Sequence, residues 1–291
     1  MSVETRLGSD QFVGSDLGPQ KAEQEFYPKN NHRFPQTREE FVGYLAENWA
    51  DLWVDVPRAW LDLARAQIEL RQLRLRPIDR DRDLPRGDGS TVVIVPGFMG
   101  WGRLYRETVK NLRSIGYQAE TYPLYFGVNV EPTEAMVDDF VSYLSSKKKE
   151  TGKKVHVIGH SKGGHLTRTA QILDTERYED SVDQDIDVGS PIPTRVNLAV
   201  GAGYLVSQYV FGGNDFKLTK LVENGEFFRN RNHVRRTTLR IKNDPIVDGI
   251  YLGPEEDQFE VKGSHSGALV NRDNLRLIAQ RLALSKLAKA A

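Results

Sequence analysis

The chain of 291 residues contains no cysteine, which excludes disulfide bonds, zinc–thiolate sites and a cysteine nucleophile. Its 40 basic and 40 acidic residues cancel, so it has neither the basic field that attracts nucleic acid nor an acidic tail. No apolar run approaches the roughly 18–20 residues that a membrane-spanning helix needs. The first ten residues lack the apolar segment of a secretion signal. We therefore expect a cytoplasmic protein that does not bind nucleic acid.

The first 90 residues indicate an arm followed by a helical segment. Residues 1–36 are polar and lack periodicity, which predicts an irregular N-terminal arm. Within residues 37–90, a capping box at Thr37 and Glu40 precedes apolar residues at helical spacing. A second helix is expected to begin near Pro57, because proline is tolerated in the first turn of a helix. The segment is thus predicted to be a helical hairpin followed by a connector.

The predicted hairpin is rich in large apolar side chains and carries three of the four tryptophans. The stripe on its second helix consists of Val56, Trp60, Leu63, Ala64 and Ile68. In one interpretation this stripe packs against the main domain. In the other, the hairpin is a surface for lipid, for an acyl substrate, for a membrane or for a partner chain.

From residue 91 onward, short apolar segments alternate with helical patterns. Thr91–Val95 has no polar face, as expected of a parallel strand that is buried on both sides. Further strands are predicted at 118–122, 155–159, 186–188, 236–242 and 258–261, with a closing helix at 271–284. The alternation predicts an α/β fold in which residues 91–291 form a doubly wound, mostly parallel sheet. Residues 190–235 exceed an ordinary connection and are either a lid over an acyl pocket or a structural insertion.

The most informative motif is Gly-His-Ser-Lys-Gly at residues 159–163, directly after a short apolar run. It matches the pattern G-x-S-x-G, in which a serine lies on a sharp turn between a strand and a helix. Such a turn brings backbone segments close together, so the flanking positions require glycine. We expect Gly159 and Gly163 to make room for the turn, His160 to support it and Ser161 to be a nucleophile.

A serine hydroxyl becomes a useful nucleophile when a base takes its proton and a carboxylate orients that base. One known chain order of this triad places the acid between the serine and the histidine. His265 is the only histidine that follows all credible acids, and it lies just after the last predicted strand, so it is the predicted base. Asp244 is the predicted acid because the proline after it ends the preceding strand. Asp248 is the alternative.

A negative charge that develops on a carbonyl oxygen needs backbone N–H donors that are already in place. One such donor belongs to the residue after the nucleophile, which is Lys162. The second is expected in the loop after Thr91–Val95, where Gly97 and Gly100 allow the backbone to turn inward. The backbone amide of Phe98 is the predicted second donor.

Metal and cofactor chemistry fit the sequence less well. His156, His160 and His165 span a strand, a turn and a helix, so they cannot form a metal-binding pair on one helix face. The glycines match neither a phosphate-binding loop nor a dinucleotide-binding loop. We expect no metal and no cofactor.

With these residues identified, residues 90–286 resemble the α/β-hydrolase superfamily, and within it bacterial lipase- and esterase-like serine hydrolases. Five landmarks carry the resemblance: Val-Pro-Gly-Phe-Met-Gly, Val-Ile-Gly-His-Ser-Lys-Gly-Gly, Gly189-Ser-Pro, Asn243-Asp-Pro-Ile-Val and Gly263-Ser-His-Ser-Gly. The resemblance implies that Ser161, Asp244 and His265 form a catalytic triad. Lys162 departs from the family, in which Met, Gln or Leu is more usual. Its charge either favours an anionic or polar substrate or faces solvent.

The leading hypothesis is therefore an esterase or lipase that cleaves a small-molecule ester or a lipid through an acyl-enzyme intermediate. A second hypothesis is acyl transfer to an acceptor other than water by the same triad. A third is a binding protein that has the fold without the activity, because a fold alone does not determine function. The sequence does not predict an oligomeric state.

Overall fold

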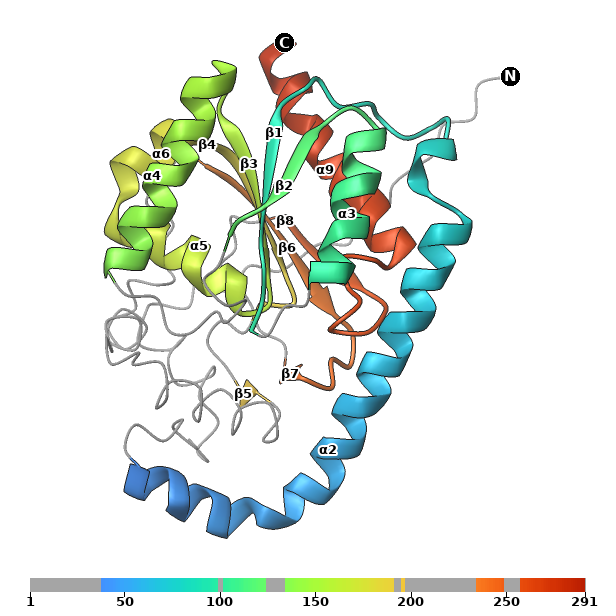
Figure 1. Ribbon diagram of the computed structural model, residues 1–291, viewed down its shortest axis with the longest axis vertical. Coiled ribbons are helices and arrows are strands. Elements are labelled where there is room, and N and C mark those ends of the chain that lie inside the picture. Colours follow the sequence, from blue (N-terminus) through green and yellow to red (C-terminus); the bar gives the residue numbers. More distant parts are fainter. Residues whose placement is uncertain are drawn as a thin grey trace, which may run out of the picture. The chain divides into compact units, whose positions relative to one another are not determined.

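The computed structural model describes residues 38–98, 102–123, 134–190, 195–196, 234–248 and 257–290 (Figure 1). The chain divides into a small unit, Met1–Gly43, and a large unit, Tyr44–Ala291, and the interactions described below lie within the large unit. The predicted arm at 1–36 and most of the predicted lid at 190–235 lie outside the described residues.

The large unit is built on a six-stranded sheet with the order β2-β1-β3-β4-β6-β8, in which every pair of neighbours is parallel. The strands are β1 (Thr91–Val95), β2 (Gln118–Thr121), β3 (Val155–His160), β4 (Val182–Val188), β6 (Arg235–Ile241) and β8 (Asp257–Val261). β1 and β3 are buried along their whole length. The sequence of β1 is accordingly apolar without alternation, whereas β3 also contains the buried His156 and His160. The predicted α/β class and the mostly parallel sheet are confirmed. A short antiparallel pair, β5 (Arg195–Val196) with β7 (Val247–Asp248), lies outside this sheet.

Helices cover both faces of the sheet (Figure 1). On one face lie α4 (Glu134–Thr151), α5 (Lys162–Leu173) and α6 (Thr175–Ser181). On the other lie α3 (Gly102–Ser114), the 3-10 turn η1 (Ile78–Arg80), α9 (Arg272–Ala290) and the C-terminal part of α2 (Arg38–Leu75). Alternate side chains of β1 enter the two cores, with Val92 and Ile94 in one and Val93 and Val95 in the other. The sheet is therefore buried on both faces, and its carboxyl edge is left for chemistry.

The N-terminal segment forms one continuous helix, α2, so the predicted break into a hairpin is wrong. Pro57 lies inside this helix. Proline removes one backbone hydrogen bond and crowds the preceding turn, but the helix can continue past it. Among the helices that the structure describes, none has both the length and the hydropathy to cross a bilayer.

The apolar stripe that was expected to pack onto the main domain faces outward instead. Val56, Leu63 and Ile68 are exposed, and Trp60 is 69% exposed. The buried face of α2 consists of Asp62, Ala66, Glu69, Leu70 and Leu73. The interpretation in which the stripe packs on the domain is thus wrong, because α2 docks through a mixed face that contains two carboxylates.

A buried ionic cluster joins strands β4 and β6 beneath α5. Arg236 contacts Asp185 at 2.7 Å and Asp187 at 3.3 Å, and all three side chains are fully buried. The hydroxyl of Tyr178 donates a second hydrogen bond to Asp185 at 3.0 Å. Two carboxylates buried side by side require this cation, because an uncompensated buried charge is strongly destabilising.

Replacing Arg236 by methionine should therefore lower the free energy of unfolding by about 3–5 kcal/mol, because it leaves two buried carboxylates without their cation. Arg235 is the matched control, since it is adjacent but pairs with Asp257 at 2.9 Å in a half-exposed position. Arg235→Met should cost less than about 1 kcal/mol. Chemical denaturation of both variants measures these free energies of unfolding. An equal loss of stability in the two variants would contradict the claim that the buried carboxylates require Arg236.

Candidate active site

Ser161 lies at the junction of β3 and α5 with a strained backbone. Its φ is 53° and its ψ is −126°, a region that residues with a side chain rarely adopt. The backbone is held there by hydrogen bonds from Ser161 N–H to Val188 at 2.9 Å and from Gly164 N–H to Ser161 at 3.0 Å. The turn therefore presents the Ser161 side chain at the carboxyl edge of the sheet.

Glycines around Ser161 allow three backbone segments to meet at this turn. A Cβ at Gly163 would lie 2.2 Å from the carbonyl oxygen of Val95, and one at Gly159 would lie 2.8 Å from the Cα of Gly164. Gly97 lies against the serine itself, because its Cβ would be 2.8 Å from the Cβ of Ser161. Any side chain at these positions would force the turn and the loop after β1 apart.

The structure brings Ser161, His265 and Asp244 into one hydrogen-bonded chain. His265 Nε2 lies 2.8 Å from Ser161 Oγ, across 104 residues of sequence. His265 Nδ1 lies 2.7 Å from Asp244 Oδ2. An ionised carboxylate only accepts, so the proton belongs on Nδ1, and Nε2 is left to accept from the serine hydroxyl. This is the arrangement in which an imidazole can take a proton from serine.

Asp244 is oriented by the turn that follows β6. Its Oδ1 accepts backbone N–H groups from Ile246 at 2.8 Å and from Val247 at 3.0 Å, so Oδ2 is left for the imidazole. The side chain is 2% exposed. The side chain of Asp248, the alternative acid, lies outside the described part of the chain.

The surroundings of His265 favour its protonated form. Burial alone would lower the pKa of His265, but the charge and the hydrogen bond of Asp244, with a further contribution from the charge of Asp62, outweigh it and raise the pKa. Gly189 forms one wall beside the ring, since a Cβ there would lie 3.3 Å from His265 Nδ1. With a φ of 57°, Gly189 also has a conformation that favours glycine.

His160 is buried behind this chain and is held as a neutral imidazole. Burial, with the nearby His265, lowers the pKa of His160 to about 3. Its Nε2 lies 3.0 Å from the carbonyl oxygen of His265, so it donates there. Its Nδ1 accepts from the hydroxyl of Tyr105 at 2.8 Å, and that hydroxyl accepts the N–H of Gly97 at 3.0 Å. This relay links the loop after β1 to the loop that carries His265.

Lys162 begins helix α5, and its side chain is only 8% exposed. Its ammonium lies 2.9 Å from Nδ1 of His165. The alternative in which Lys162 faces solvent is therefore wrong. The backbone N–H of Lys162 belongs to the first turn of α5. Phe98 directly follows Gly97, the residue that lies against Ser161.

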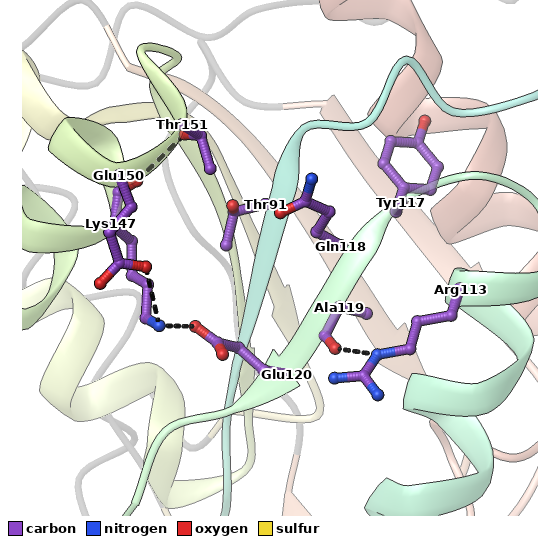
Figure 2. Close-up of a pocket in the computed structure, with 9 residues that line it drawn as sticks. All are labelled: Thr91, Arg113, Tyr117, Gln118, Ala119, Glu120, Lys147, Glu150 and Thr151. Carbon is purple, nitrogen blue, oxygen red and sulfur yellow. Dashed lines mark hydrogen bonds and ion pairs between the residues drawn. The ribbon is translucent and has the colours of Figure 1, made fainter.

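A separate cavity of about 340 Å³ lies at the amino ends of β1 and β2 (Figure 2), whereas Ser161 follows the carboxyl end of β3. Its charged side chains already have partners within the protein. Lys147 bridges Glu120 at 3.1 Å and Glu150 at 3.2 Å, while Arg113 donates to the carbonyl of Ala119 at 2.7 Å. We therefore assign the chemistry to the Ser161 edge and not to this cavity.

Comparisons with known proteins support the fold. Neither a family model nor a curated protein sequence matches the chain. A soluble variant of monoglyceride lipase from Saccharomyces cerevisiae, solved with a substrate analogue, is 13% identical over 69% of this chain and 89% of that chain, with a TM-score of 0.53. Aspergillus fumigatus lipase B is 16% identical over 67% of this chain and 53% of that chain, with a TM-score of 0.53. The chain has the α/β-hydrolase fold.

No sequence motif marks Tyr105, whose hydroxyl contacts both the Gly97 amide and the His160 ring. Tyr105→Phe leaves the Gly97 amide and the His160 ring without a shared partner, so we expect a loss of about 1–3 kcal/mol in stability. Catalytic turnover should fall as well, because both loops beside Ser161 lose a common anchor. Tyr143→Phe is the matched control. The hydroxyl of Tyr143, on α4, donates to Glu120, on β2, at 2.8 Å and, among the described residues, does not contact the loops beside Ser161. Thermal unfolding and ester turnover of both variants check this, and equal behaviour would contradict it.

Proposed function

We propose that this protein is a serine hydrolase that cleaves carboxylic esters. The single observation that carries the proposal is the hydrogen-bonded chain from Ser161 through His265 to Asp244, which begins at a strained strand-to-helix turn. A serine in such a turn with an oriented histidine is suited to acyl transfer. In this proposal Ser161 is the nucleophile, His265 the general base and Asp244 the acid.

In the first half-reaction, Ser161 Oγ attacks the carbonyl carbon of the ester while His265 Nε2 takes the hydroxyl proton. The resulting imidazolium is stabilised by the carboxylate of Asp244, which stays ionised. Collapse of the tetrahedral intermediate breaks the bond to the alcohol oxygen. His265 gives its proton to that oxygen, and the alcohol leaves an acyl group on Ser161.

In the second half-reaction, water replaces the alcohol. The water oxygen attacks the acyl carbon while His265 Nε2 takes a proton from the water. The ester bond to Ser161 then breaks, and the proton on Nε2 returns to Ser161 Oγ. The acid is released, and the hydrogen bond between Ser161 and His265 is restored.

The backbone amides of Phe98 and Lys162 are the proposed donors to the oxyanion of both intermediates. Gly97 lies against Ser161, which brings the next amide, that of Phe98, close to the reacting oxygen. Lys162 follows Ser161 at the start of α5, where the helix dipole also favours negative charge. Fixed donors of this kind are each worth about 10²–10³ in turnover.

Lipid esters are the first substrate class to test. The monoglyceride lipase and the lipase B share this fold, and their names motivate lipid esters as substrates for the first assays. Lys162 is buried with its ammonium 2.9 Å from Nδ1 of His165, and an anionic or polar ester is the alternative substrate class.

Ser161→Ala should abolish hydrolysis of p-nitrophenyl esters, with a loss of at least about 10⁴ in kcat, because the acyl acceptor is removed. The measurement compares wild type and variant on esters from acetate to palmitate. Ser146→Ala is the control, since the hydroxyl of Ser146 bonds a carbonyl on α4 in an exposed position. Near-wild-type hydrolysis by Ser161→Ala, in protein with an unchanged unfolding transition, would exclude the mechanism.

A further inference from the structure

Helix α2 holds the loop that carries His265 through Asp62. The carboxylate of Asp62 is 1% exposed and accepts two consecutive backbone amides of that loop. His265 N–H donates to Oδ1 at 2.7 Å, and Ser266 N–H donates to Oδ2 at 2.9 Å. Both oxygens of this buried side chain are therefore used to fix the backbone of His265 itself.

Glu69 holds the preceding part of the same loop. Its Oε1 accepts the N–H of Ser264 at 3.0 Å and the side-chain amide of Asn271 at 3.0 Å. Its Oε2 accepts the hydroxyl of Ser264. Asp62 and Glu69 are seven residues apart, which is about two helical turns, so they lie on the same face of α2. Three successive amides, at positions 264–266, thus bond to one helix.

The helix and the loop are in direct contact between these two carboxylates. A Cβ at Gly267 would lie 2.8 Å from the Cα of Ala66 and 2.1 Å from Glu69 Oε2. Small residues on both sides therefore permit backbone-to-backbone contact. There is no room for a side chain between them, and the position of the loop follows the position of α2.

The docking face of α2 contains two buried carboxylates, Asp62 and Glu69, whose burial is energetically unfavourable in itself. Burying an ionised carboxylate is unfavourable unless hydrogen bonds replace the lost water. An apolar stripe was available on the same helix, in Trp60, Leu63 and Ile68, yet these residues are exposed. The carboxylates instead provide directional hydrogen bonds to the backbone beside His265, which apolar packing cannot provide.

We propose that Asp62 and Glu69 are positioning residues for the ester hydrolysis proposed above, because they fix the backbone at 264–266 so that His265 meets Ser161. This inference rests on the proposed ester hydrolysis, and it gives helix α2 a role in positioning the catalytic histidine. In the described structure the imidazole is thus oriented from two directions. Asp244 holds the ring at Nδ1, and Asp62 holds the main chain of the same residue.

Asp62 also contributes charge beside the imidazole. Among the described residues, the neighbours of His265 include Asp244 from the turn after β6, Asp62 from α2, His160 from β3 and Ser161 from the elbow. His160 is neutral at ordinary pH, so the two carboxylates are the charged members of this set. Both favour the imidazolium that forms when Ser161 attacks.

The first experiment is Asp62→Asn, measured as kcat, KM and the pH dependence of kcat/KM on one p-nitrophenyl ester. We expect kcat to fall about 10- to 100-fold with KM little changed, because a displacement of about 1 Å at a reacting group can cost about 100-fold. The midpoint of the acid limb should move to lower pH, because loss of the nearby negative charge of Asp62 disfavours the imidazolium. A purely structural role would not move this midpoint.

Two further variants separate the contributions. Glu69→Gln should also lower kcat but should move the acid midpoint less than Asp62→Asn does, since Glu69 contacts Ser264 and not His265. Glu107→Gln is the matched control, because it removes the negative charge that pairs with Arg74 at 2.8 Å between α2 and α3. It should leave both kcat and the midpoint unchanged.

The pKa of the His265 imidazole, followed by NMR in wild type and in Asp62→Asn, distinguishes failure of this inference from failure of the proposed function. A lowered His265 pKa in Asp62→Asn supports the inference without reference to turnover. An unchanged pKa together with an unchanged kcat would overturn it, even if Ser161 proves essential. Should Asp62→Asn fail to fold, Glu69→Gln decides: a fall in kcat in folded protein supports positioning by α2, and wild-type kcat contradicts it.

Discussion

The architecture depends on one backbone conformation, the positive φ at Ser161. A residue with a side chain avoids this region, so the surroundings must hold it there. Gly163 and Gly97 do so by letting the end of β1 and its following loop approach within van der Waals distance. The Arg236 cluster ties β4 to β6, and the carbonyl of Val188 at the end of β4 accepts the N–H of Ser161.

Polar groups that are buried around this turn connect the three segments of the site. The relay through Tyr105 and His160 reaches from the loop after β1 to the carbonyl of His265, and Asp62 takes the amide of the same residue. His265 is therefore anchored at its carbonyl, its amide and its ring. A histidine held at these points loses little further freedom when it accepts a proton, which is the advantage of a preorganised site.

Local patterns were sufficient to predict the sheet and the three residues of the hydrogen-bonded chain. β1 has a buried apolar sequence, strand and helix patterns alternate along the chain, and Ser161, Asp244 and His265 each follow a strand at the same edge. The failures concern α2. Pro57 suggested a helix start, and apolar periodicity selected the face that proved exposed. Asp62 and Glu69 contact residues 203 and 195 positions away, and no local pattern marks such partners.

The central claim is that Ser161 is an activated nucleophile in the folded protein. The most direct measurement is treatment of native protein with a fluorophosphonate, followed by peptide mapping by mass spectrometry. The account predicts one adduct per chain, located on Ser161, and its loss when His265 is replaced by alanine. Native protein that remains unlabelled at Ser161, or that is labelled equally well without His265, would contradict the account.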